Sequence, residues 1–129
     1  MAITVLLADD SELVRRAIRR LLSDQPQIAL VGEAGDFAQT IEMANSLKPH
    51  VIVLDLHMSD GRSISPSQFK SRVDSIASRL VAISVWNDKE TRALAESFGA
   101  IELLDKVSLG TRLIPAILQL APPATGGTQ

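Results

Sequence analysis

The chain has 129 residues, enough for one domain with a single core and too few for two ordinary domains. Apolar side chains make up 46% of it, which suffices for a core, and the lack of cysteine excludes disulfides and thiolate metal sites. The net charge of -2 gives no general attraction to nucleic acid or acidic membranes. The sequence shows neither a signal peptide nor an apolar run near the roughly 20 residues that span a bilayer, so we expect a soluble cytoplasmic domain without membrane contact.

Short apolar runs rich in β-branched residues recur along the chain, and none alternates cleanly between polar and apolar residues. These runs are 3–7, 28–31, 51–54, 80–83 and 101–104. Continuous apolar strands of this kind are typical of a parallel sheet whose two faces are both covered by helices.

Helical patterns separate these runs. The first has an apolar stripe opposite a row of arginines, which we interpret as a solvated helix face; the row is Arg15, Arg16, Arg19 and Arg20. The second helix can be capped by Asp36 and is closed by Lys48 and the proline after it. The fourth can be capped by Asp88 or Asn87 and ends at Gly99.

Two further helical patterns are less regular. The third covers about 66–77, and Pro66 suits its first turn. The last covers about 111–120 and contains Pro115, which conflicts with a helix interior. The conflict is resolved only if the last helix starts late enough to place Pro115 near its first turn.

A strand followed by a helix thus occurs five times. Right-handed connections then give an α/β fold, a doubly wound five-stranded parallel sheet with helices on both faces. We assign residues 1–120 to this domain. The segment 121–129, rich in proline, glycine and threonine, is predicted to be a disordered tail or the start of an interdomain linker.

Polar residues follow the predicted strands at their carboxyl ends. Asp9 and Asp10 follow the first strand, Asp55 the third, Ser84 the fourth and Lys106 the fifth. Each alone has an ordinary explanation: Asp10 and the serine after it could cap a helix, and Lys106 could be a surface lysine. Together they converge on the edge of the sheet where ligands bind in such folds.

This set of residue types suits phosphoryl chemistry. Three carboxylates in one cleft repel one another unless a cation sits among them, and Mg²⁺ prefers such oxygen ligands. A carboxylate can attack phosphorus to give an aspartyl phosphate. A lysine and a hydroxyl can then neutralise the charge on the transferred group.

Six stretches of this sequence resemble the receiver domain of two-component response regulators. They are V-L-L-A-D-D-S (5–11), V-G-E-A-G-D (31–36), V-I-V-L-D-L-H-M (51–58), A-I-S (82–84), F-G-A (98–100) and L-L-D-K (103–106). The resemblance covers roughly residues 3 to 120. It implies a flavodoxin-like sheet with the strand order 2-1-3-4-5. The V-G-E-A-G segment and an R-L-I-P-A-I run near the end are similar to the subgroup that often carries a DNA-binding helix-turn-helix domain.

The resemblance also implies a role for each polar residue. Asp55 accepts a phosphoryl group from the phosphohistidine of a sensor histidine kinase or a phosphotransfer protein. Asp10, Asp55 and the main-chain carbonyl of His57 bind Mg²⁺, and Asp9 acts through a water. Ser84 and Lys106 hold the phosphoryl oxygens. Dimerisation on phosphorylation and DNA binding through a separate output domain are implied at the level of the family only.

Four positions depart from the family's pattern. Ser59 replaces a proline in the loop after the phosphoacceptor, and Val107 replaces the proline after the lysine. Leu103 stands where an aromatic residue usually reports the switch, and Val85, followed by Trp86, stands where a smaller residue is common.

Other functions remain open beside the regulatory switch. One is a pseudo-receiver that binds partners without phosphorylation, which Leu103 and Val85 keep possible. Another is a Mg²⁺-dependent phosphohydrolase with an aspartyl nucleophile, but that chemistry normally needs a second aspartate where this chain has His57. We expect no turnover enzyme. The chain could be a stand-alone receiver or the receiver part of a transcriptional regulator, and we favour the second. His50 is expected to be a solvated loop residue.

Overall fold

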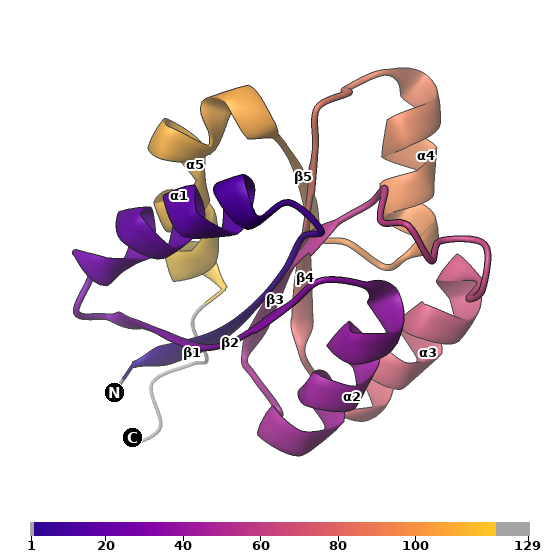
Figure 1. The fold of residues 1–129 in the computed structure, drawn as a ribbon, viewed down its shortest axis with the longest axis horizontal. Helices are drawn as coiled ribbons and strands as arrows, with labels where there is room; N and C mark the ends of the chain where they lie inside the picture. Colours follow the sequence, from indigo (N-terminus) through magenta and orange to yellow (C-terminus); the bar gives the residue numbers. More distant parts are fainter. Residues whose placement is uncertain (1, 121–129) are drawn as a thin grey trace.

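Five parallel strands form one sheet in the order β2-β1-β3-β4-β5, as Figure 1 shows for this computed structural model. The structure describes residues 2–120. The strands are β1 (Ile3–Ala8), β2 (Ile28–Ala34), β3 (Val51–Asp55), β4 (Arg79–Ser84) and β5 (Glu102–Asp105). The helices are α1 (Glu12–Ser23), α2 (Phe37–Leu47), α3 (Pro66–Ser75), α4 (Lys89–Ser97) and α5 (Leu109–Gln119), with a short 3₁₀ turn, η1 (Lys106–Ser108), before α5.

All five predicted strands and the predicted fold class are confirmed. The central strand β3 lies between β1 and β4 in the sheet, and every one of its residues is buried. Both of its faces are covered by helices, which explains why its sequence is continuously apolar rather than alternating. The segment 121–129, predicted to be a tail or linker, lies outside the described residues.

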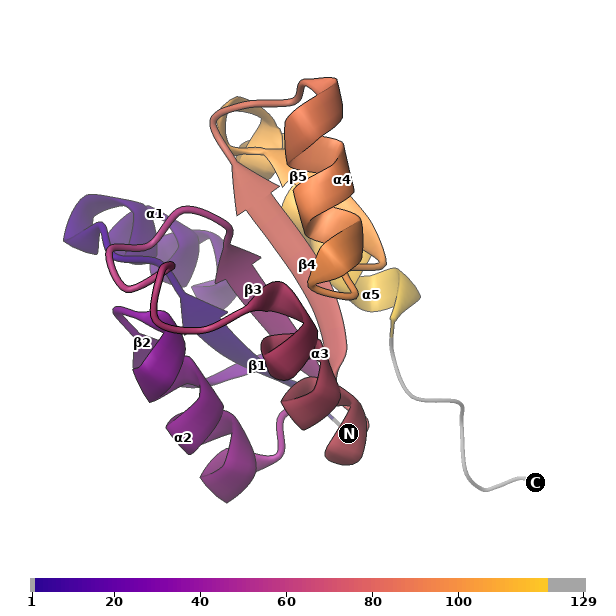
Figure 2. The same cartoon turned by 90° about the vertical axis from the view of Figure 1, so that its right-hand side faces the viewer.

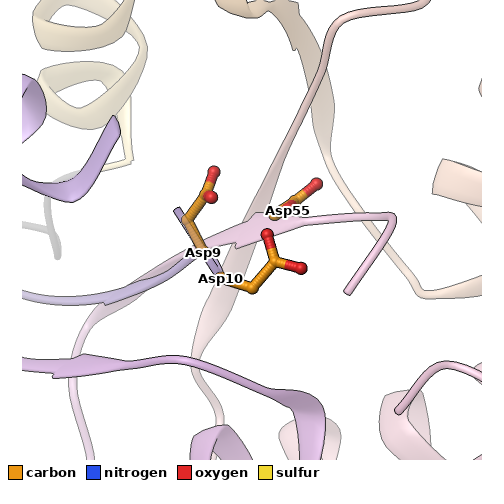
Figure 3. A group of neighbouring side chains, drawn as sticks. All are labelled: Asp9, Asp10 and Asp55. Carbon is orange, nitrogen blue, oxygen red and sulfur yellow. The ribbon is translucent and has the colours of Figure 1, made fainter. Parts of the chain in front are cut away.

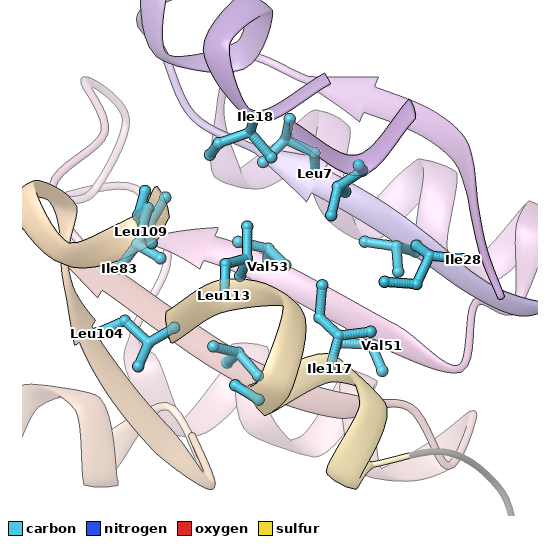
Figure 4. Packing of buried hydrophobic residues seen from close by; sticks show 14 of the residues in the cluster. Leu7, Ile18, Ile28, Val51, Val53, Ile83, Leu104, Leu109, Leu113 and Ile117 are labelled. Atoms are coloured by element: carbon cyan, nitrogen blue, oxygen red, sulfur yellow. The ribbon is translucent and has the colours of Figure 1, made fainter. Parts of the chain in front are cut away.

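The sheet separates two hydrophobic cores. Helices α1 and α5 cover one face, and α2, α3 and α4 cover the other (Figures 1 and 2). On the first face Leu113 and Ile117 of α5 pack against Val53 and Val51 of β3 (Figure 4). On the second face the rings of Phe37, Phe69 and Phe98 lie with their centroids 5.3 to 5.8 Å apart, so that they tie α2, α3 and the end of α4 together. The strand ends that carry the polar residues thus stand on a rigid frame.

Side-chain caps set where most of the helices begin. Ser11 accepts a hydrogen bond from the Val14 amide at the start of α1, and Asp36 accepts one at the start of α2. Asp88, rather than Asn87, caps α4. Each cap satisfies an amide that the first helical turn leaves free. None of the described helices has both the length and the apolar character needed to cross a membrane.

The last helix starts earlier than predicted, and the conflict at Pro115 remains. Helix α5 begins at Leu109, so Pro115 lies in its interior and not in its first turn. Proline there lacks the amide that would bond the carbonyl of Thr111 and crowds that carbonyl. The buried residues Leu113 and Ile117 on either side hold the helix against the sheet in spite of this local cost.

Replacing Pro115 with alanine is expected to raise the free energy of unfolding by about 2 kcal/mol. The expected gain is the cost of a proline in a helix interior minus a smaller contribution of opposite sign. Proline stabilises the folded protein by roughly 0.4–1 kcal/mol because it restricts the unfolded chain. Urea unfolding of both proteins measures the difference. Gln119→Ala, at another exposed position of α5, should change stability by less than about 0.5 kcal/mol. Equal stability of the Pro115→Ala and wild-type proteins would contradict the assigned cost.

The interpretation of His50 as a solvated loop residue was also wrong. Its ring Nδ1 accepts a hydrogen bond from the Thr4 amide at 3.0 Å, and its own amide donates to Thr4 Oγ1 at 3.0 Å. β1 and β3 are adjacent in the sheet, so the residue before β3 reaches the polar groups near the start of β1. His50 therefore closes the amino-terminal edge of the sheet, opposite the acidic residues.

Candidate functional site

The carboxyl ends of β1 and β3 bring the predicted aspartates together. β1 and β3 pair in parallel, with Ala8 opposite Leu54, so the residues that follow lie side by side. One carboxylate oxygen from each of Asp9, Asp10 and Asp55 lies within 4.8 Å of the others (Figure 3). The convergence expected from the strand pattern is therefore present in the structure.

Asp9 is fully buried and is held from several directions. Its amide donates to the carbonyl of Ala34 at 3.0 Å, and its Oδ1 accepts from the Ser11 amide at 2.8 Å. Its Oδ2 forms an ion pair with Lys106 Nζ at 2.8 Å. No group among the described residues donates a hydrogen bond to this oxygen. One oxygen of Asp9 is thus left for a further ligand.

Asp55 and Asp10 differ in their surroundings. Asp55 is 3% exposed, its Oδ1 accepts from the His57 amide at 3.1 Å, and its Oδ2 lies 3.5 Å from Lys106 Nζ. Asp10 is exposed, and within residues 2–120 its carboxylate forms neither a hydrogen bond nor an ion pair. Lys106 therefore serves two of the three acids and leaves the third without a cation.

Burial raises the pKa of Asp55 above its ordinary value, and the charges of Asp9 and Asp10 raise it further. The His57 amide and the Lys106 ammonium act in the opposite direction without cancelling this effect. A carboxylate with a raised pKa retains its proton more readily and is costly to ionise in the folded protein. The site would gain from a cation that removes this cost.

The raised pKa of Asp55 predicts a pH-dependent difference between the wild type and Asp55→Asn. Below the unfolded-state pKa of an aspartate the group is protonated in both states, and ionisation costs nothing. As the pH rises through the higher folded-state pKa, the wild type loses stability that the asparagine variant keeps. Without Mg²⁺, Asp55→Asn should melt at a higher temperature than the wild type at neutral pH, and this difference should shrink toward acid pH.

Melting curves of both proteins across this pH range, recorded in a chelator, measure the difference. A constant difference at every pH, or a less stable asparagine variant at neutral pH, would contradict the assignment. Added Mg²⁺ should stabilise the wild type more than the variant.

The residues present fit Mg²⁺. The site combines three carboxylates with one lysine, and a buried oxygen of Asp9 lacks a hydrogen-bond donor among the described residues. A hard dication with oxygen ligands would satisfy that oxygen and relieve the repulsion between the acids. Asp10 and Asp55 are the residues that would hold it directly, with Asp9 beside them. The main-chain carbonyl of His57 belongs to the loop after Asp55, and its role as a metal ligand stays a prediction.

Ser84 lies beside this cluster without joining it. It ends β4, next to β3, and its side chain is fully buried. Its Oγ accepts a hydrogen bond from the Trp86 amide at 3.0 Å, and the Trp86 ring meets the His57 ring edge-on with centroids 4.8 Å apart. Ser84 would have to turn its hydroxyl hydrogen toward a phosphoryl group, and its role there stays a prediction.

Two of the residues that depart from the family's pattern, Val85 and Val107, lie on the surface, 57% and 88% exposed. Leu103 is partly buried and packs against the core on the side of α4. No peptide bond among the described residues is cis. These positions leave the acidic cluster and Lys106 intact.

Arg15 contacts the site, although its pattern in the sequence indicated only a solvated helix face. Its guanidinium donates to the main-chain carbonyl of Asp9, so it is not simply part of a solvated face. Arg19, from the same row, binds Glu33 at the end of β2. One feature of the sequence could have indicated this contact. Arg15 lies one helical turn after Ser11, the N-cap of α1, and Ser11 directly follows Asp10.

The comparisons with known proteins agree with this geometry. The family model of the response regulator receiver domain matches residues 5–118. The nitrate/nitrite response regulator protein NarL of Escherichia coli is 37% identical over 118 residues, covering 92% of this chain and 54% of that protein. The transcriptional regulatory protein LiaR of Bacillus subtilis is 34% identical over 115 residues, covering 89% and 54%. This chain thus spans about half the length of these curated relatives.

A solved structure is similar over nearly its whole length. The signal receiver domain of NarL from Mycobacterium tuberculosis superposes with a TM-score of 0.80 and 29% identity, over 92% of this chain and 94% of that one. The segment that the family model matches carries the three aspartates and Lys106. The chain belongs to the response regulator receiver domain family of two-component signalling systems.

Proposed function

We propose that this domain is a switch that accepts a phosphoryl group on Asp55 in the presence of Mg²⁺. The observation that carries the proposal is the placement of Asp55, buried between two further aspartates and 3.5 Å from the Lys106 ammonium. The donor is the phosphohistidine of a sensor histidine kinase or phosphotransfer protein. The domain undergoes this reaction once per signal and is not a turnover enzyme.

The reaction needs little beyond positioning and charge. A carboxylate oxygen of Asp55 attacks phosphorus as the bond from phosphorus to the donor's imidazole nitrogen breaks, and the released imidazole takes up a proton. Lys106 offsets the negative charge on the phosphoryl oxygens, and the Ser84 hydroxyl donates to one of them. Asp10 and Asp55 would hold Mg²⁺, which would supply positive charge to offset that of the transferred phosphoryl group. The His57 amide keeps the Asp55 side chain in one orientation.

We also propose an output for the phosphorylated domain. The relatives NarL and LiaR are named as a response regulator and a transcriptional regulatory protein, and each is about twice as long as the matched segment. This supports a receiver that controls a separate DNA-binding output domain. Association of two phosphorylated copies is one way in which phosphorylation would control that domain. In a stand-alone receiver the same switched surface would act on a partner protein.

Phosphorylation by a small donor tests the proposed function. The purified chain is incubated with acetyl phosphate, with and without Mg²⁺, and its intact mass is measured beside that of Asp55→Ala. We expect one added phosphoryl group on the wild type only when Mg²⁺ is present, and none on the variant. A wild type that binds Mg²⁺ but gains no mass from acetyl phosphate, or from a panel of phosphorylated kinases, would favour the pseudo-receiver, the alternative that Leu103 supports.

A further inference from the structure

The Arg15 side chain of helix α1 contacts the peptide group that joins Asp9 to Asp10. Its guanidinium Nη1 donates to the carbonyl oxygen of Asp9. The side chain is only 18% exposed although it stands on the outer part of an amphipathic helix. A charged donor to a backbone carbonyl in such a partly buried place forms a strong and directional hydrogen bond.

Two acids hold the Arg15 side chain in this position. Glu12, one turn earlier in α1, lies 2.7 Å from its Nη2, and Glu33 of β2 lies 3.3 Å from its Nε. Glu33 is itself bound by Arg19 at 2.6 and 3.0 Å, which lowers the pKa of the Glu33 carboxyl. Glu33 therefore stays ionised and available to Arg15 over the physiological pH range.

The carbonyl that Arg15 binds belongs to the peptide group that leads to Asp10. Because a peptide group is planar, fixing the carbonyl of Asp9 also fixes the amide of Asp10 and the bond that leads to its Cα. The amide and Oδ1 of Asp9 are already hydrogen-bonded, to Ala34 and Ser11, and Oδ2 is the oxygen that lacks a hydrogen-bond donor among the described residues. The Asp10 carboxylate has no partner of its own within residues 2–120. Its direction thus depends on this peptide plane.

We propose that Arg15 is a positioning residue for Mg²⁺, which sets the Asp9–Asp10 peptide so that the Asp10 carboxylate faces the metal. The inference rests on the proposed function, because it assumes that the aspartates hold Mg²⁺. It assigns a role to a side chain that touches neither the metal nor the phosphoryl group. Contacts of this supporting kind typically change metal affinity by about 10- to 100-fold.

The charge of Arg15 makes the proposal sharply testable. A positive charge near a cation site weakens cation binding, so removing it without any other effect would tighten the binding of Mg²⁺. A positioning role predicts the opposite sign. We expect Arg15→Ala to bind Mg²⁺ about tenfold more weakly than the wild type. Arg15→Lys, which keeps the charge but cannot engage both acids and the carbonyl at once, should fall between the two.

A matched control separates position from charge. Arg16→Ala removes the same charge from the next, exposed residue of α1. This variant should bind Mg²⁺ as tightly as the wild type or slightly more tightly.

The experiment is a titration of the full chain with Mg²⁺, followed by the amide NMR signals of Asp10 and His57, with urea unfolding in a chelator measured on the same proteins. A merely structural role of Arg15 would lower the stability of the metal-free protein and leave the Mg²⁺ affinity of the folded protein unchanged. Unchanged or tighter Mg²⁺ binding by both Arg15→Ala and Arg15→Lys would overturn the inference about Arg15 and would leave the proposed function standing. Absence of Mg²⁺ binding by the wild type would overturn the proposed function, and the inference with it.

Discussion

Replacing Lys106 with alanine is expected to slow phosphorylation by acetyl phosphate by about 10²- to 10³-fold at saturating Mg²⁺. The Lys106 ammonium lies 2.8 Å from Asp9 and 3.5 Å from Asp55, so it stands where charge gathers during transfer. Loss of one preplaced donor of this kind commonly costs this factor. Without the lysine the three carboxylates would also repel one another more strongly. The rate of mass gain, measured by intact mass spectrometry, gives the factor.

Lys70→Ala provides the control for this prediction. Lys70 lies on the exposed side of α3, where it pairs with Asp74 at 2.8 Å. The change removes the same charge from the chain without touching the site, and the rate should stay within about twofold of the wild type, because salt screens exposed charges. If Lys106→Ala reacted as fast as Lys70→Ala, the lysine would have no part in the transfer.

Replacing Asp10 with asparagine is expected to have opposite effects on metal binding and on stability. Asp10 is exposed and unpartnered among the described residues, so neutralising it removes only repulsion toward Asp9 and Asp55. The metal-free variant should be as stable as the wild type or more so. Its Mg²⁺ affinity should fall by about 100-fold or more, because even indirect contacts to a metal are worth 10- to 100-fold. Mg²⁺ titrations and urea unfolding of the same samples measure both quantities.

Asp24→Asn is the matched control for Asp10. Asp24 is also exposed and stands at the other end of α1, so the change in net charge is the same. It should leave both the Mg²⁺ affinity and the stability close to those of the wild type. A common drop in affinity for both variants would indicate a general electrostatic effect and would contradict a ligand role for Asp10.

The fold and the convergence of the site could be predicted because both follow from local sequence. A strand such as Val51–Asp55 is apolar along its length and ends in a charge, and parallel strands bring such ends to one edge. The caps at Asp36 and Asp88 follow from the residue type alone.

The rest depended on contacts between segments distant in the sequence. His50 is hydrogen-bonded to Thr4, 46 residues away, and its neighbours in the sequence do not indicate this partner. Pro115 lies inside α5 because the packing of Leu113 and Ile117 outweighs the local rule against proline. Arg15 looked like one arginine of a solvated row, and only the fold places the Asp9 carbonyl and Glu33 within its reach.

The identity of the phosphorylated side chain tests the account most directly, because three aspartates share the site. The chain is treated with acetyl phosphate and Mg²⁺, the acyl phosphate is reduced with borohydride to homoserine, and the modified residue is located by peptide mass spectrometry. We predict homoserine at position 55 alone, and none when Mg²⁺ is withheld. Homoserine at position 9 or 10, or its absence from position 55 in a protein that has gained a phosphoryl group, would contradict the assignment of Asp55 as the acceptor.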